Sequence, residues 1–407
     1  MTIEEQFEQA VAEGRNVFLT GAGGTGKTTL TRRMIARDPD RFSVTASTGI
    51  AALNAGGATL HRWSGMMLGP QHGQSNDHYF ADLMNDPRRS IRAGFDRIRA
   101  CRTLVIDEIS MLNGRTLDFL DFICRKLRRN ESAFGGIQLI VTGDLCQLPP
   151  VSKTGQYDWA FQSRAWKAAD FQVIHLTEVK RQDDAEFVRA LSEFRFGAMG
   201  AASAKLLRSR VARFPDADLT RLFSHNAMVD KWNAYRLGEI DVEPTVFEAE
   251  LTGPESQQQF LIKNLLTPRE LVLKPTARVM FTVNSSEGGF VNGQTGVVAD
   301  LGFRRILVES GDKLIQVEPF KWQFDSKDRT SATFTQFPLR LASAITIHRS
   351  QSLTLDSALI DVRAAREPGQ AYVALSRVRT LSGLHLKSWF RGIYVSNAAV
   401  AFYLHSK

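Results

Sequence analysis

Residues 21–28 read Gly-Ala-Gly-Gly-Thr-Gly-Lys-Thr and directly follow the apolar run Asn16-Val-Phe-Leu-Thr20. The spacing matches G-x-x-x-x-G-K-[ST], placed between a buried strand and a helix that is expected to begin near Lys27. Glycines let the main chain curve around an anion, so that its N–H groups can bind phosphate. Lys27 can reach the β- and γ-phosphates, and the Thr28 hydroxyl can bind Mg²⁺. The sequence therefore predicts an ATP-type nucleotide site made by Gly23, Gly24, Thr25, Gly26, Lys27, Thr28 and Thr29.

The composition is that of a globular chain with two or three domains. The 407 residues include 43% hydrophobic and 23% charged residues, and the formal net charge is +8. A positive balance is compatible with a polyanionic partner, although charge alone does not identify one. Three scattered cysteines, Cys101, Cys124 and Cys146, indicate reduced thiols of an intracellular protein. We expect no secretion signal and no membrane span, and an intracellular location, most simply the cytoplasm or nucleoid of a bacterium.

Short apolar runs alternate with helical patterns in the first half, which is typical of a parallel sheet between helices. Polar residues interrupt this rhythm at about 64–94 and predict an insertion that projects from the first domain. Short β-type segments between turns at 253–330 predict a small barrel-like module inserted in a second α/β domain. The expected strands are Val17–Thr20, Phe42–Ala46, Thr103–Asp107, Leu139–Gly143 and Val173–Leu176, followed in the module by 279–283, 296–298, 306–308 and 314–317.

Two adjacent carboxylates end the apolar run Leu104-Val-Ile-Asp107-Glu108. We predict that Asp107 holds the Mg²⁺ shell and that Glu108 polarises the attacking water as general base. A protein that only binds nucleotide needs the metal ligand but no base, so this pair favours hydrolysis. Two acidic residues at an exposed strand end are the structural alternative.

Further candidates follow in the stretch Val141-Thr-Gly-Asp144-Leu-Cys-Gln147 and in two arginines. The Gln147 amide can contact both the γ-phosphate and the attacking water. Phosphoryl transfer also needs positive charge from outside the glycine-rich loop, for which Arg181 and Arg377 are candidates. The alternative for each arginine is a solvated helix position.

The order of these segments resembles helicase superfamily one, and within it the PIF (petite integration frequency) helicases of the 5′-to-3′ group. The resemblance covers nearly the whole chain, from about residue 3 to residue 386. It rests on Thr45-Ala-Ser-Thr-Gly-Ile-Ala-Ala-Leu-Asn-Ala-Gly-Gly-Ala-Thr-Leu-His61, Leu117-Asp-Phe-Leu-Asp-Phe-Ile-Cys-Arg-Lys-Leu-Arg-Arg129 with Phe134-Gly-Gly-Ile-Gln-Leu139, Phe290-Val-Asn-Gly-Gln-Thr-Gly-Val297, Leu341-Ala-Ser-Ala-Ile-Thr-Ile-His348-Arg-Ser-Gln351 and Gly369-Gln-Ala-Tyr-Val-Ala-Leu-Ser-Arg377. The family usually has Lys-Ser-Gln-Gly where this chain has Arg349-Ser-Gln351-Ser352, a difference that bears on the coupling between ATP and DNA.

The resemblance implies roles for individual residues. Gln6 would contact adenine, and Arg181 and Arg377 would be the two arginine fingers. Residues that would line a single-strand DNA track are Thr48, Gly49, His61, Asn292 and His348. Trp63 is placed beside a base, with a core position as the equal alternative.

The resemblance also implies the fold and the activity. We expect two tandem RecA-like domains, 1–180 and 181–252 with 331–407, and an SH3-like module at 253–330. The expected activity is a monomeric, Mg²⁺- and ATP-dependent 5′-to-3′ DNA helicase that hydrolyses ATP between the two domains. Single-stranded and forked duplex DNA are the expected partners, with quadruplex and RNA–DNA hybrid as open further substrates. The alternative is a single-strand translocase or remodelling ATPase that does not separate strands; a nucleotide-gated binding module or a small-molecule kinase fits the motifs less well.

Overall fold

The computed structural model describes residues 1–70, 73–152, 154–211, 219–285, 289–325, 331–351, 353–389 and 394–406. Two compact units make up the chain. The first contains residues 1–180, 367–369 and 395–407, and the second contains residues 181–366 and 370–394. Within the described residues no helix is long and apolar enough to cross a membrane.

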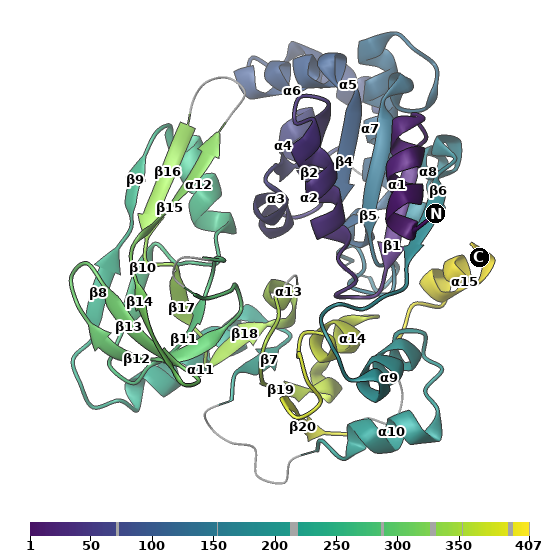
Figure 1. The fold of residues 1–407 in the computed structure, drawn as a ribbon. Coiled ribbons are helices and arrows are strands. Elements are labelled where there is room, and N and C mark those ends of the chain that lie inside the picture. The colour runs from purple at the N-terminus through teal and green to yellow at the C-terminus, as the bar shows by residue number, and fades with distance from the viewer. Residues whose placement is uncertain are drawn as a thin grey trace. The chain divides into compact units, whose positions relative to one another are not determined.

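The first unit is built on a six-stranded parallel sheet with the strand order β3-β2-β4-β5-β1-β6 (Figure 1). The apolar runs of the sequence form its central strands, because a strand covered on both faces needs hydrophobic residues on both. The five strands expected from the sequence are all present, with ends that agree to within one residue. The strands are β1 Val17–Gly21, β2 Phe42–Ala46, β3 Ala58–Thr59, β4 Thr103–Asp107, β5 Gln138–Gly143 and β6 Gln172–Leu176.

Helices cover both faces of this sheet. Phe7 of α1 and Leu30 of α2 pack on the face that presents Val17 and Leu19. Phe18 points to the opposite face, where its ring contacts Trp166 of α8 at a centroid distance of 5.1 Å. The helices of the unit are α1 Ile3–Ala12, α2 Lys27–Arg37, α3 Gly49–Ala55, α4 Leu60–Ser64, α5 Asn76–Asn85, α6 Arg89–Ala100, α7 Gly114–Arg128, α8 Arg164–Ala169 and α15 Asn397–His405, with short 3₁₀ turns η1 Ile109–Met111, η2 Ala133–Gly136 and η3 Ala160–Gln162.

The segment expected to be an insertion, at about 64–94, contains α5 and the first half of α6. An aromatic cluster ties it to α7: Phe80 contacts Phe95 of α6 and Phe122 of α7, both at centroid distances of 6.0 Å. Gly94 lies so close to α4 that a Cβ there would be 2.5 Å from the backbone nitrogen of Gly65. The segment therefore packs against α7 through Phe80 and against the end of α4 through Gly94.

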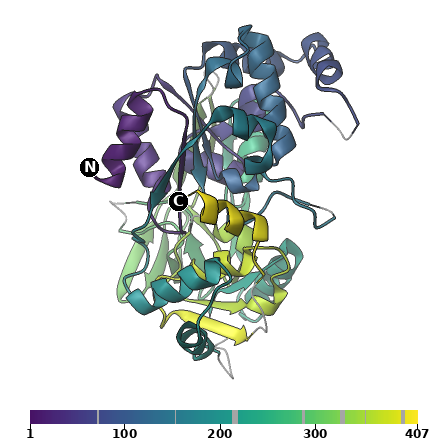
Figure 2. The ribbon, with the colours of Figure 1, turned by 90° about the vertical axis from the view of Figure 1, so that its right-hand side faces the viewer.

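The C-terminal helix α15 belongs to the first unit, which differs from the expected assignment of residues 331–407 to the second domain. Phe402 packs against Phe18 and Trp166, and the Tyr403 hydroxyl lies 2.7 Å from Thr20 Oγ1. Figure 2 shows this helix in yellow. Ala399 and Tyr403 of this helix are buried, whereas Leu404 on its other side is exposed.

The second unit has a four-stranded parallel sheet in the order β18-β7-β19-β20. Its strands come from distant parts of the sequence, because the β module is inserted between β7 and β18. The elements are β7 Arg221–Phe223, β18 Ala344–Thr346, β19 Ala358–Asp361, β20 Leu384–Ser388, α9 Ala185–Arg195, α10 Ala201–Arg208, α11 Asn226–Gly238, α13 Ile347–Ser350, η4 Val362–Ala364 and α14 Gln370–Leu375.

The inserted β module is larger than the expected range 253–330. Its strands begin at Thr245 and end at Leu341, and they form a five-stranded antiparallel sheet, a three-stranded sheet and a two-stranded ribbon. A hydrophobic core cluster in the module includes Leu271, Phe281 and Val308. Its elements are β8 Thr245–Glu248, β9 Glu250–Thr252, α12 Glu255–Asn264, β10 Glu270–Leu273, β11 Arg278–Phe281, β12 Thr295–Leu301, β13 Ile306–Ser310, β14 Lys313–Val317, β15 Phe320–Asp325, β16 Ser331–Gln336 and β17 Leu339–Leu341.

Candidate nucleotide-hydrolysis site

The glycine-rich loop joins β1 to α2, and α2 begins at Lys27 as expected. Gly24 and Gly26 have φ angles of 89° and 87°, a left-handed conformation that glycine adopts without steric cost. The Lys27 ammonium donates to the main-chain carbonyls of Gly21, at 2.8 Å, and Ala22, at 3.0 Å. The cation thus lies inside the curve of the loop, where a triphosphate would need its charge.

Asp107 lies beside Thr28 at the end of β4. The Thr28 hydroxyl donates to Asp107 Oδ2 at 3.3 Å, and the Thr142 hydroxyl donates to Asp107 Oδ1. The parallel register explains the contact of Thr142 with Asp107. Ile106 pairs with Val141, and so the next residues of β4 and β5 lie side by side. One hydroxyl and one carboxylate oxygen of the predicted metal site are therefore adjacent in the fold.

Glu108 follows with a left-handed backbone, φ 54° and ψ 49°, which is uncommon for a residue with a side chain. Its N–H donates to Asp107 Oδ1 at 2.9 Å, and its carbonyl accepts from the Ser47 hydroxyl at 2.7 Å. The local fold holds this conformation by hydrogen bonds on both sides of the residue. Strained backbone of this kind is frequent at catalytic positions.

Gln147 belongs to a buried polar network that follows β5. Its amide nitrogen donates to Asp144 Oδ2 at 3.3 Å, and the Cys146 N–H donates to Asp144 Oδ1 at 3.1 Å. The Tyr403 hydroxyl accepts from the Leu145 N–H at 2.9 Å and lies 2.7 Å from Thr20 Oγ1. The network therefore joins the end of β5 to the strand that enters the glycine-rich loop.

Arg181 and Arg377 lie together in the second unit. The Arg181 guanidinium donates to the Ser376 carbonyl at 3.0 Å and to the Thr354 hydroxyl at 3.1 Å. Arg377 is only 2% exposed and donates to the Val373 carbonyl and the Ser376 hydroxyl, each at 2.8 Å. Both arginines are thus held at the C-terminal end of α14 and are not freely solvated helix residues.

The residues proposed for the DNA track lie on different helices and loops of the two units. Thr48 caps α3, its hydroxyl accepting from the Ala51 N–H at 3.2 Å, and Gly49 is the first residue of that helix. His61 lies on α4, where burial lowers its pKa and so favours the neutral ring at pH 7. His348 is half-buried on α13 of the second unit.

The remaining candidate residues, Trp63, Asn292 and Gln6, differ in how far they are buried. Trp63 is 5% exposed in the core of the first unit, so its position is that of the core alternative and does not suit base stacking. Asn292 is half-buried, and its backbone N–H donates to Asn284 Oδ1 at 2.8 Å. Gln6 is an exposed residue of α1. Ser352 lies outside the described residues.

Sequence reasoning missed the residues that support the site. Ser47, Thr142 and Tyr403 hydrogen-bond to catalytic candidates or to their neighbours. Thr142 could have been found, because it occupies the position in β5 next to the carboxylate that ends β4. Tyr403 carries no such signal, since it lies far along the chain from every motif.

The donor set fits Mg²⁺ bound together with a nucleotide. The described residues contain no group of three or more His, Cys, Asp or Glu side chains that could hold a metal by themselves. Mg²⁺ in nucleotide sites needs fewer protein ligands, because phosphate oxygens and waters complete its octahedron. Thr28 and Asp107, in direct contact, are the residues that would hold it.

The chain is similar to several known proteins over nearly its whole length. A family model described as PIF1-like helicase matches residues 2–195. The ATP-dependent DNA helicase Pif1 of Bdellovibrio bacteriovorus is 37% identical over 412 residues, which cover 98% of this chain and 92% of the relative. A crystal structure of Bacteroides sp. Pif1 with ADP-AlF4 is 31% identical and has a TM-score of 0.84, with 100% of this chain and 96% of that chain covered. Bacteroides Pif1 with ADP-AlF3 and ssDNA is 32% identical, with a TM-score of 0.67 and the same coverage.

Proposed function

The chain belongs to the PIF1-like helicase family, and we propose that it is an ATP-dependent DNA helicase that moves 5′-to-3′ on single-stranded DNA and unwinds duplex. The prediction of two RecA-like domains is confirmed by the match to the Bacteroides structures. The observation that carries the activity is the convergence of Lys27, Thr28, Asp107 and Glu108 at one edge of the first sheet. A base next to a metal ligand supports hydrolysis as well as binding of nucleotide.

In this proposal the glycine-rich loop binds the phosphates of ATP through its N–H groups, and the Lys27 ammonium balances the charge of the β- and γ-phosphates. Thr28 and Asp107 hold Mg²⁺, which would neutralise charge on the same phosphates. Glu108 accepts a proton from the attacking water. Gln6 would contact adenine from the N-terminal helix.

Arg181 and Arg377 are proposed to stabilise the charge that develops on the γ-phosphate. A planar guanidinium suits this role, because it presents several donors to phosphate oxygens in a fixed geometry. Gln147 would contact the γ-phosphate and the attacking water. Its hydrogen bond to Asp144 supports an amide held in one orientation.

DNA binding is proposed for Thr48, Gly49, His61, Asn292 and His348. The Ser47 hydroxyl, directly before Thr48, is bonded to the Glu108 carbonyl, which supports a link between DNA and hydrolysis. We further propose that the chain is a monomer in solution and acts inside the cell. Forked duplex DNA is the proposed substrate for strand separation.

The test combines two measurements on the full chain. ATP hydrolysis is measured with and without single-stranded DNA, and unwinding is measured on duplexes with a 5′ or a 3′ tail. We expect DNA-stimulated hydrolysis and unwinding of the 5′-tailed duplex only, both lost in Lys27→Ala and kept in Lys167→Ala, an exposed control lysine on α8. Stimulated hydrolysis without unwinding would identify a translocase, and hydrolysis that DNA does not affect would overturn the helicase assignment.

A further inference from the structure

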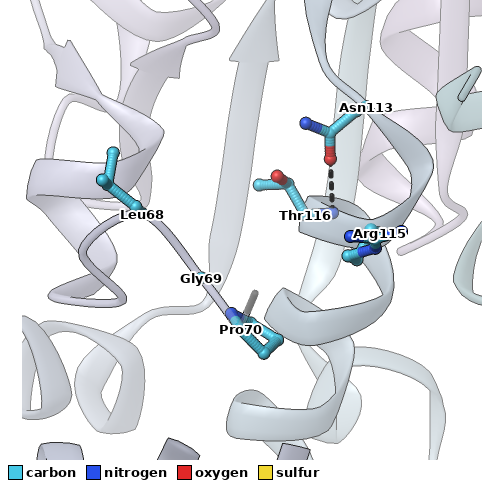
Figure 3. A pocket seen from close by; sticks show the side chains of 6 residues that line it. All are labelled: Leu68, Gly69, Pro70, Asn113, Arg115 and Thr116. Atoms are coloured by element: carbon cyan, nitrogen blue, oxygen red, sulfur yellow. Dashed lines mark hydrogen bonds between the residues drawn. The ribbon is translucent and has the colours of Figure 1, made fainter. Parts of the chain in front are cut away.

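A pocket of about 170 Å³ lies in the first unit beside the start of α7 (Figure 3). This volume is many times what a single water requires, so the pocket can accept a group of several atoms. One wall comes from the loop after α4 and the other from the first residues of α7. The lining residues are Leu68, Gly69, Pro70, Asn113, Arg115 and Thr116.

The backbone N–H groups at the start of α7 already have partners within the protein. Gly114 N–H donates to the Asp158 carbonyl and Arg115 N–H to Asp158 Oδ2, both at 2.9 Å. Thr116 N–H donates to the Asn113 side-chain oxygen at 2.7 Å. The Asp158 carboxylate is thereby held by the helix end, and these three N–H groups are already engaged and do not serve a ligand in the pocket.

Three side-chain donors remain. Thr116 is 5% exposed, its hydroxyl points into the pocket, and it has no hydrogen-bond partner among the residues that the structure describes. Because the Asn113 oxygen is engaged, its amide nitrogen is the group left to donate. The Arg115 side chain is exposed and pairs with no carboxylate in the described parts of the chain.

These groups favour an anionic ligand rich in oxygen. The lining residues include an arginine, an asparagine and a threonine, and none of them is acidic. Arginine with small polar side chains is the usual donor set for phosphate oxygens in nucleic-acid complexes. Pro70 adds an apolar surface that suits the carbon atoms of a sugar.

We propose that this pocket binds a phosphodiester group of a DNA strand, with Arg115 and Thr116 as donors. The proposal rests on the proposed helicase function, since it names a further contact with the same partner. It places that contact at the start of α7, apart from the residues expected to line the DNA track.

Two conservative variants test the two donors separately. Arg115→Gln removes one charge, and Thr116→Val removes the hydroxyl while keeping the shape and the N–H bond to Asn113. Arg129→Gln is the matched control, because it removes an exposed charge from the other end of the same helix. The dissociation constant of labelled single-stranded DNA is measured without ATP over a series of salt concentrations.

We expect Arg115→Gln to weaken binding about tenfold and to reduce the slope of log K against log salt by about 0.7, the value for one phosphate on a single strand. Thr116→Val should weaken binding about threefold with an unchanged slope, because no charge is lost. Arg129→Gln should match the wild type. Wild-type affinity and slope in both pocket variants would overturn the proposal.

A second arm separates DNA from free phosphate. The melting temperature of the wild type and of both variants is measured with added inorganic phosphate. If the variants lose a phosphate-induced shift but bind DNA normally, the ligand is free phosphate and the DNA assignment is overturned. If the wild type itself fails to bind DNA, the helicase function fails, and a phosphate shift that both variants lose would still support an anion site. Arg115 is exposed, so its variant remains informative even if Thr116→Val does not fold.

Discussion

The Ser47 hydroxyl donates a hydrogen bond to the Glu108 carbonyl, with 2.7 Å between the two oxygens. Ser47 follows β2 and stands directly before Thr48, the first residue proposed for DNA contact. Glu108 follows β4 and is the proposed base. The bond is possible because Ala46 and Asp107 pair in the parallel register, so both segments leave the sheet at one edge. If DNA displaced the segment after β2, the hydrogen bond from Ser47 would therefore also displace Glu108, the proposed base.

Ser47→Ala tests this link. One hydrogen bond contributes about 1 kcal/mol, so we expect DNA-stimulated turnover to fall about fivefold. ATP affinity and turnover without DNA should change little, because the phosphate ligands are intact. The measurement is the ATPase rate over a titration of single-stranded DNA. Ser43→Ala, on the strand that precedes Ser47, is the control, and an unchanged DNA response in Ser47→Ala would show that the bond does not transmit the signal.

Glu108→Gln separates binding from hydrolysis. We expect turnover to fall by about 10² to 10⁴, the usual contribution of a general base, with ATP and DNA affinity retained. Glutamine has the same shape and keeps the backbone bonds to Asp107 and Ser47, so the left-handed conformation should persist. Single-turnover hydrolysis and nucleotide titration supply the two measurements. Glu131→Gln, an exposed site in the same unit, is the control. A parallel loss of nucleotide affinity would make Glu108 a ligand and not the base.

Arg377→Lys keeps the charge but not the planar fork. We expect hydrolysis to fall about 10³-fold, as for loss of an arginine finger, while ADP affinity is unchanged because ADP lacks the contacted phosphate. Arg377→Ala should show the same loss and also a lower melting temperature, since this side chain is buried and bonded to Val373 and Ser376. Arg379→Lys is the control from the same segment. Near-normal turnover in Arg377→Lys would limit Arg377 to a structural role.

Arg340 should limit the stability of the second unit. It is 7% exposed, and its Nε and Nη1 atoms have no hydrogen-bond partner among the described residues. Burial, and then the nearby Arg349, lower its pKa to about 10. We expect Arg340→Met to raise stability by about 1–3 kcal/mol, because a buried unpaired charge is removed. Thermal unfolding measures this, with exposed Arg269→Met as control; a lower melting temperature would show that the guanidinium is stabilising.

Local patterns in the sequence were enough to predict the first sheet and the glycine-rich loop. Phe42–Ala46 and Thr103–Asp107 agree with the structure at both ends, because one alternates apolar and hydroxyl residues, the other has an apolar centre, and each is bounded by turn or polar residues. The contact between Thr28 and Asp107 also follows from the sequence, since the glycine-rich loop that leads to Thr28 and the residue Asp107 both lie at the carboxyl edge of the parallel sheet.

Other features depend on packing between distant segments and could not be read locally. Trp63 stands beside a motif histidine, and only the close packing of α4 on α6 shows it to be buried. The module extends to Thr245 and Leu341 because strands at its edges pair with strands inside it, which no single segment reveals. The return of α15 to the first unit likewise rests on contacts such as that of Tyr403 with Thr20.

The position of α15 also constrains how the protein is made. Ribosomes deliver the chain from its N-terminus, and domains generally fold as they emerge. Here the strand that carries Thr20 is synthesised 383 residues before its partner Tyr403. The first unit therefore cannot complete its core until α15 has been synthesised. A truncated chain that stops before Asn397 would leave Phe18 and Trp166 without their contact to Phe402 and would be exposed to proteolysis and aggregation during biogenesis.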